Sequence, residues 1–135
     1  MSFELVVRVY WEDTDAGGIV FYANYLKFFE RARTEWLRSL GFGQNRLREQ
    51  TGGIFVVSQT SVRYRQPARL DDELIISARL QTAGRASMLI SQEAHHRDSG
   101  ALLAEGTIRI GWVEAGTLRP ARIPPIVIES LVRPT

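Results

Sequence analysis

The hydrophobic period of this chain changes once from helical to strand-like, and that single change is what most constrains the fold. From about Ala23 to Leu40, apolar residues recur every three or four positions, which predicts one long helix. Downstream, strand-like segments are expected at Ile54–Arg65, Glu73–Thr82, Ala86–His96 and Ala101–Val113. Short Gly-containing links join the last three segments, so neighbouring strands are antiparallel and a parallel nucleotide-binding sheet is excluded.

Weaker patterns complete the predicted order of elements. Phe3–Trp11 alternates as a half-buried strand, and Gln44–Glu49 favours a short helix. Asn24 is expected to cap the long helix and Gly41 to end it, while the tail forms a cover segment or a short last helix. With no repeat and no linker, residues 1–135 form one α+β domain with the helix on one face of a curved sheet. Sheet surface that one helix leaves uncovered predicts a homodimer.

Composition narrows the chemistry that the chain can carry. The 135 residues include no Cys and only two His, which are adjacent, so thiol catalysis, Cys-ligated zinc and a multi-His metal site are excluded. The net charge is only +2, and 16 of the 17 basic residues are Arg without any polybasic run, which argues against nucleic acid as the partner. No window approaches the ~20 apolar residues of a membrane span, and no signal sequence is evident, so we expect a cytoplasmic protein.

The loop before the long helix concentrates the unusual residues: three acids and two glycines stand beside several aromatic residues. Asp13 or Asp15 can simply accept backbone N–H bonds near the helix start. Alternatively, one carboxylate faces a pocket as a nucleophile or general base. A calcium loop starting at Asp13 fails at three ligand positions, Gly17, Phe21 and Asn24, and a D-x-D phosphatase or glycosyltransferase requires a larger fold.

The run EDTDAGGIVFYANYLKFFERARTEWL closely resembles the signature of the 4-hydroxybenzoyl-CoA thioesterase family of hotdog-fold proteins, nearest to its Tol-Pal-associated branch. The resemblance implies a helix wrapped by a five-stranded antiparallel sheet, paired into dimers or tetramers with acyl-CoA clefts between subunits. It also implies hydrolysis of an acyl- or aroyl-CoA thioester without a cofactor, with Asp15 as the catalytic carboxylate. The alternative is a non-catalytic protein of the same fold that binds acyl-CoA or acyl carrier protein, or that serves in envelope assembly.

Further site residues follow from the same resemblance. Backbone groups at the helix start would polarise the thioester carbonyl, and the candidates for this and for substrate positioning are Gly18, Tyr22, Asn24 and Tyr25. Tyr22 stands where several relatives have His, so the role of that His does not carry over. The candidates for CoA contacts, on a polar strand face expected beside the helix start and on nearby loops, are Gln59, Ser61, Arg63, Arg65, Arg69 and Arg85. Glu30 is expected to form an ion pair with Arg31 or Arg33.

Overall fold

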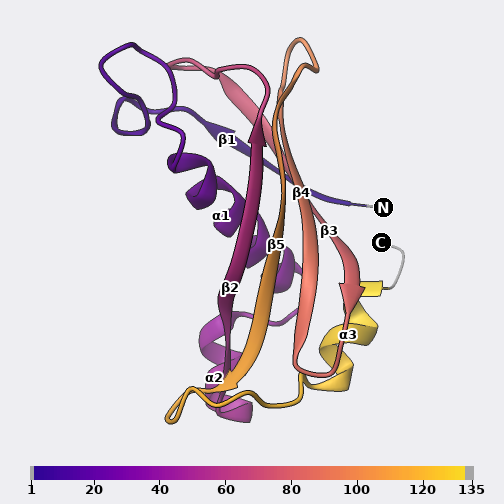
Figure 1. Ribbon diagram of the computed structural model, residues 1–135. Helices are drawn as coiled ribbons and strands as arrows, with labels where there is room; N and C mark the ends of the chain where they lie inside the picture. The colour runs from indigo at the N-terminus through magenta and orange to yellow at the C-terminus, as the bar shows by residue number, and fades with distance from the viewer. Residues whose placement is uncertain (1, 133–135) are drawn as a thin grey trace.

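A computed structural model describes residues 2–132, which form a five-stranded sheet and three α-helices (Figure 1). All paired strands are antiparallel, and their order across the sheet is β1-β3-β4-β5-β2. In chain order the elements are β1 (Phe3–Arg8), a 3₁₀ turn (Trp11–Asp13), α1 (Asn24–Ser39), α2 (Gln44–Thr51), β2 (Gly53–Tyr64), β3 (Glu73–Ala83), β4 (Ser87–His96), β5 (Leu102–Glu114) and α3 (Pro125–Val132). The predicted fold class and the four long strands are confirmed.

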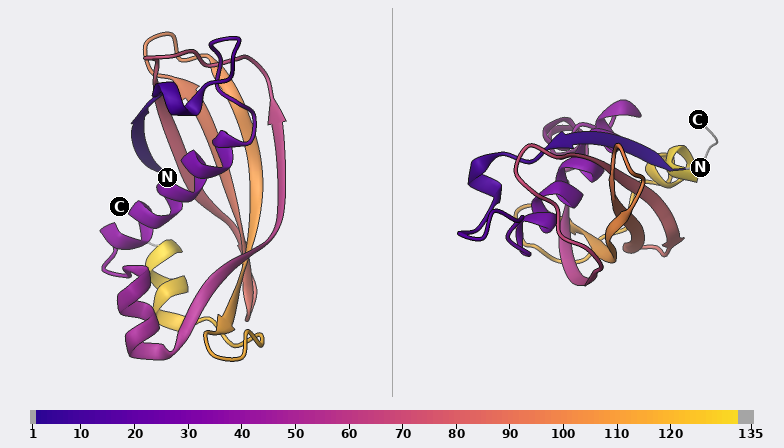
Figure 2. Two further views of the ribbon diagram at one scale, coloured as in Figure 1. Left: turned by 90° about the vertical axis from the view of Figure 1, so that its left-hand side faces the viewer. Right: turned by 90° about the horizontal axis from the view of Figure 1, so that it is seen from above.

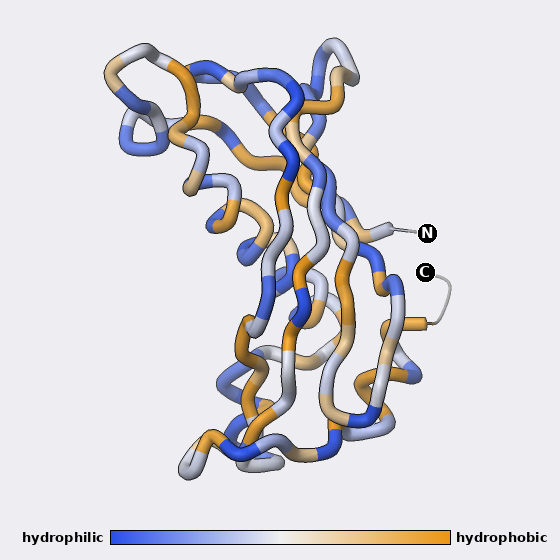
Figure 3. Tube along the Cα trace, in the orientation of Figure 1, coloured by the Kyte–Doolittle hydropathy of each residue, from blue (hydrophilic) through white to orange (hydrophobic). Residues whose placement is uncertain are grey.

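The sheet curls around α1, so one face of the sheet is concave and encloses the helix (Figure 2). The buried side of α1 carries the residues of the predicted apolar stripe: Tyr25, Phe28, Phe29, Ala32, Trp36 and Leu37. Buried and more exposed residues alternate along β3 and β4, because successive side chains point to opposite sheet faces. Figure 3 shows apolar and polar stretches in every long strand. Among residues 2–132, no helix is long and apolar enough to cross a membrane.

Two predicted boundaries near the N-terminus are wrong. The first strand ends at Arg8 rather than Trp11, because Asp13 bonds back to Tyr10 through both its backbone N–H and its side chain and closes a 3₁₀ turn. Asn24 does not cap α1: it is the first residue of the helix, and its side chain donates to the carbonyl of Asp13 at 2.8 Å. The expected left-handed glycine is confirmed, since Gly41 has a φ of 90°.

A bulge in β2 sets which of its side chains face the helix. The register with β5 shifts between Val57 and Gln59, and beyond the shift Ser61 pairs with Thr107 and Arg63 with Glu105. These partners alternate with the buried Ile108 and Ala104 of β5, so they point to the convex face, away from α1. The expectation that Gln59, Ser61 and Arg63 form a polar face beside the helix start is therefore wrong.

One buried polar side chain links the sheet to the helix. Gln92 of β4 is fully buried; its Nε2 donates to the carbonyls of Phe29 and Ser77 at 3.0 and 3.1 Å. Its Oε1 accepts a hydrogen bond of 2.9 Å from the Arg33 guanidinium. Burial lowers the pKa of Arg33, and Glu30 partly offsets this. The network fixes the position of α1 over the sheet.

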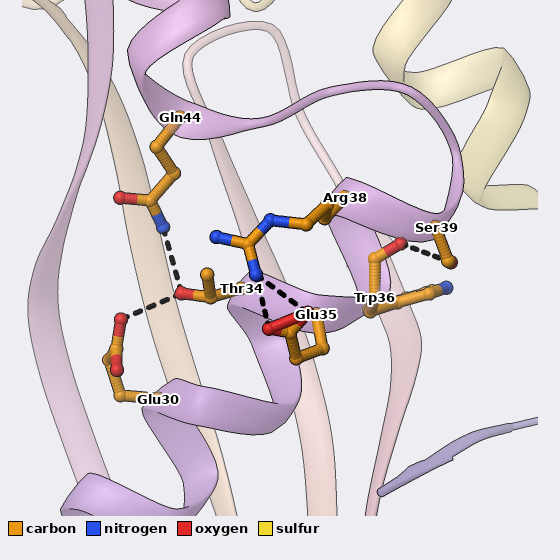
Figure 4. Close-up of polar contacts among 7 residues, drawn as sticks. All are labelled: Glu30, Thr34, Glu35, Trp36, Arg38, Ser39 and Gln44. Atoms are coloured by element: carbon orange, nitrogen blue, oxygen red, sulfur yellow. Dashed lines mark hydrogen bonds and ion pairs between the residues drawn. The ribbon is translucent and has the colours of Figure 1, made fainter.

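The predicted ion pair of Glu30 with Arg31 or Arg33 is wrong. The hydroxyl of Thr34 donates to Glu30 at 2.7 Å and accepts from Gln44 of α2 at 3.1 Å (Figure 4). Glu35 and Arg38, one turn further along, form the ion pair in this region of α1. The contacts around Thr34 therefore join the two helices through neutral and singly charged hydrogen bonds.

Candidate functional site

The loop from Thr14 to Val20, which we call the Asp15 loop, is a small closed turn just before α1. Thr14 pairs with Val20, and the N–H of Asp15 donates to the carbonyl of Ile19 at 2.9 Å. The N–H of Gly18 donates back to the carbonyl of Asp15 at 3.1 Å, and Gly18 has a φ of 80°, a conformation that glycine adopts without strain. The loop is thus held by its own backbone bonds.

The two acids of the D-x-D run have different environments. Asp13 is buried, with 6% of its surface exposed, and its carboxylate accepts the N–H of Tyr10 at 2.8 Å. Asp15 is exposed, and its Oδ1 accepts the N–H of Gly17 at 2.8 Å. Asp13 is therefore the acid whose carboxylate has a structural role, as an acceptor of a backbone N–H. Asp15 is the acid whose carboxylate is accessible from solvent.

Asp13 also joins the loop to the start of α1. Its carbonyl accepts the backbone N–H of Phe21 at 3.0 Å and the side-chain amide of Asn24 at 2.8 Å. These bonds hold the first turn of α1 next to the Asp15 loop. The N-terminus of a helix favours negative charge, so an anion that develops here is stabilised by the aligned backbone dipoles.

Three tyrosines line a cavity of about 210 Å³ beside the helix start. The lining residues are Val20, Tyr22, Tyr25, Tyr64, Arg65, Gln66 and Pro67. The ring of Tyr64 lies 6.0 Å from that of Tyr22 and 5.6 Å from that of Tyr25, and its hydroxyl donates to the carbonyl of Tyr22 at 3.0 Å. The cavity adjoins the Asp15 loop through Val20.

The two inner tyrosines are held in the protonated form by their surroundings. Tyr25 is only 3% exposed, and burial raises the pKa of its phenol, although the N–H of Ala68 donates to the hydroxyl at 3.3 Å and partly offsets the rise. Burial likewise raises the pKa of Tyr64, with a smaller contribution from Tyr22. Both hydroxyls are therefore neutral hydrogen-bonding groups near neutral pH.

The structure brings together some of the predicted site residues and separates others. Around the helix start lie Asp15, Gly18, Tyr22, Asn24, Tyr25 and Arg65. Arg65 also pairs with Glu105 at 3.2 Å. Arg85 lies in the link between β3 and β4, at the end of the sheet opposite to this site (Figure 1).

Sequence reasoning missed Tyr64, which closes the cavity. The signal was present, because Tyr64 alternates with Ser61 and Arg63 in parity across β2 and so had to occupy the face opposite to theirs. Within residues 2–132, no group of three or more His, Asp or Glu side chains is placed to hold a metal ion.

Comparison with known proteins extends this description. Residues 9–131 match the family described as the thioesterase-like superfamily. The chain is 40% identical to the acyl-CoA thioesterase YbgC of Haemophilus influenzae over 91% of this chain and 89% of that protein. It is 38% identical to the acyl-CoA thioester hydrolase YbgC of Escherichia coli over 93% of this chain and 92% of that protein. The crystal structure of a probable thioesterase from Bartonella henselae superposes with a TM-score of 0.85 at 31% identity, covering 92% of this chain and all of that one (100%).

Proposed function

The chain belongs to the thioesterase-like superfamily, and from this premise we propose that it hydrolyses an acyl- or aroyl-CoA thioester to a carboxylate and free CoA. The single observation that carries the proposal is the exposed carboxylate of Asp15 at the start of α1, next to the tyrosine-lined cavity. The names of the relatives support the same reaction class.

In the proposed reaction Asp15 acts as the nucleophile or as the general base. As nucleophile, a carboxylate oxygen attacks the thioester carbonyl, the C–S bond breaks, and water hydrolyses the resulting anhydride. As base, Asp15 takes a proton from the water that attacks. In both cases the thiolate is a good leaving group and needs no strong acid. The N–H of Gly17 fixes one oxygen of Asp15 and so limits the directions in which the other oxygen points.

Backbone N–H groups at the helix start would stabilise the oxyanion. Those of Gly17, Gly18 and Asn24 already donate to protein oxygens. Within residues 2–132, the N–H groups of Tyr22 and Ala23 have no acceptor in the protein, and we assign these two donors to the developing oxyanion. One well-aimed donor of this kind is worth roughly 3 to 4 kcal/mol in the transition state.

The surface around the cavity suits a second copy of the chain. The helix packs chiefly on β1 and β3, at one edge of the sheet. The strand β2 forms the opposite edge. Val57 and Tyr64 of β2 are 52% and 44% exposed. Tyr22, which contacts Tyr64, and Leu26 in the first turn of α1 are 62% and 42% exposed. We propose that these apolar side chains meet their counterparts in a homodimer, which is either the complete assembly or one half of a homotetramer. Light scattering should give a dimer or larger for the wild type, and a Val57→Lys variant should dissociate; a monomeric wild type would refute this assembly.

The proposed function is tested by steady-state hydrolysis of short-chain, long-chain and aryl acyl-CoA substrates, with an acyl carrier protein thioester included. We expect Asp15→Asn to lower kcat by roughly 10² to 10⁴-fold. Glu12→Gln, an exposed acid of the preceding turn, is the matched control and should keep the wild-type rate. EDTA should leave the rate unchanged, since the proposed chemistry uses no metal.

Wild-type turnover by Asp15→Asn would overturn the catalytic assignment. Tight binding of acyl-CoA or acyl carrier protein by the wild type without any hydrolysis would favour the alternative of a non-catalytic binding protein.

A further inference from the structure

The turn formed by residues 68–72, which we call the brace turn, supports the Asp15 loop from the side. Two backbone hydrogen bonds join the two segments: the N–H of Val20 donates to the carbonyl of Ala68 at 2.9 Å, and the N–H of Leu70 donates to that of Gly18 at 3.4 Å. Together they form the antiparallel bridge between Ile19 and Arg69. The brace turn connects β2 to β3, so it is an element distant in sequence from the loop that it holds.

The carboxylate of Asp72 ties the brace turn in two directions. Its Oδ2 accepts the backbone N–H of Arg69 at 2.9 Å, which closes the turn. Its Oδ1 lies 3.4 Å from Nε2 of His96 at the end of β4. Because Nδ1 of His96 accepts the N–H of Ser99 at 3.3 Å, the ring N–H is on Nε2, the nitrogen that faces Asp72.

The brace turn is strained and therefore depends on such ties. Asp71 has a φ of 71°, a left-handed conformation that a non-glycine residue adopts only when its surroundings hold it there. Its N–H donates to the carbonyl of Val9 at 3.0 Å, and its carbonyl accepts from the Arg8 guanidinium at 2.8 Å. The backbone of Asp72 also holds the turn, through Val9 and Arg69, and the Asp72 carboxylate adds the bond to the N–H of Arg69, the residue that pairs with Ile19 of the Asp15 loop.

We propose that Asp72, oriented by His96, is a positioning residue for Asp15. The carboxylate of Asp72 fixes Arg69 within the brace turn, and the two backbone hydrogen bonds on either side of Arg69 position the loop that carries Asp15. This inference rests on the proposed function. Displacement of a reacting group by about 1 Å can cost a hundredfold in rate, so a loosened brace turn should slow the reaction without removing any group that touches the substrate.

The test compares Asp72→Ala with the wild type in steady-state hydrolysis. We expect kcat to fall at least tenfold with little change in KM, and Asp72→Asn to recover part of the loss because its amide oxygen replaces one of the two acceptors. In an Asp15→Asn background, adding Asp72→Ala should leave the Kd for the intact acyl-CoA unchanged, measured by calorimetry. A purely structural defect would instead weaken binding together with turnover.

A second carboxylate–imidazole pair supplies the matched control. Glu93 lies 3.6 Å from Nε2 of His95, the residue before His96, and this pair faces the convex side of the sheet. Glu93→Ala should therefore keep the wild-type kcat. If the circular dichroism melting curve shows that Asp72→Ala does not fold, His96→Ala replaces it in the test. We expect kcat to fall several-fold in His96→Ala, less than the tenfold expected for Asp72→Ala.

The outcomes separate the two proposals. Wild-type kcat in folded Asp72→Ala, or an equal loss in Glu93→Ala, would overturn the positioning role while Asp15→Asn remains inactive. If instead Asp15→Asn hydrolyses acyl-CoA at the wild-type rate, the proposed catalytic assignment fails first, and a positioning role toward Asp15 fails with it.

Discussion

Replacement of the buried Gln92 by Leu should loosen α1 from the sheet and cost a large part of the stability of the fold. The change keeps the approximate volume of the side chain but removes its three hydrogen bonds, two to the carbonyls of Phe29 and Ser77 and one from Arg33. A neutral hydrogen bond contributes about 1 kcal/mol and one with a charged partner about 2 kcal/mol, so we expect a loss of about 3 to 4 kcal/mol. That is a substantial share of the roughly 5 to 15 kcal/mol typical of a domain.

The assay is urea unfolding followed by circular dichroism. A loss of this size should lower the midpoint by roughly 2 M at unchanged slope. The matched control is Gln81→Leu, at an exposed position of β3, which should change the free energy of unfolding by no more than about 0.5 kcal/mol.

A double-mutant cycle with Arg33→Met measures the coupling free energy between Gln92 and Arg33. The Gln92 variant leaves the Arg33 guanidinium partly buried without its acceptor, so removing the guanidinium as well should recover at least about 1 kcal/mol. A loss below about 1 kcal/mol in Gln92→Leu, or full additivity in the cycle, would refute the view that this network anchors α1.

Two further predictions concern the site. In Gly17→Ala the new Cβ would lie 3.2 Å from Oδ1 of Asp15, so kcat should fall several-fold with little loss of stability. In Gly18→Ala the new Cβ meets nothing within 4 Å, but the φ of 80° should lower the free energy of unfolding by about 1 to 2 kcal/mol. Urea denaturation and steady-state kinetics on both variants check this contrast. Burial raises the pKa of Tyr25 above its ordinary value of 10.0, so the stability that depends on its neutral phenol is complete below about pH 10 and is lost as pH rises through the folded-state pKa. Tyr25→Phe should abolish that alkaline loss, measured as the free energy of unfolding between pH 8 and 11, while losing about 1 kcal/mol at neutral pH with the Ala68 hydrogen bond.

Most of the architecture could be predicted from the sequence because it depends on local periodicity. The spacing of Tyr25, Phe28, Phe29, Trp36 and Leu37 predicted α1, and Gly41 marked its end. The four long strands were placed within one residue at each end, whereas the first strand ends three residues earlier than predicted. The resemblance to hotdog-fold thioesterases is confirmed at the level of the superfamily. The helix and strand periods require only knowledge of neighbours two to four positions apart along the chain.

The roles of individual polar residues could not be predicted in this way. Residue types and spacing alone left Asp13 and Asp15 open, and it was the family resemblance that implied Asp15; the 3₁₀ turn of the folded chain buries Asp13 and leaves Asp15 exposed. The face of β2 that meets the helix depends on pairing with β5 some fifty residues later, which placed Tyr64 at the cavity and Arg63 away from it. Patterns along the chain report the period of an element, whereas the direction in which a side chain points depends on contacts between segments that the chain brings together only on folding.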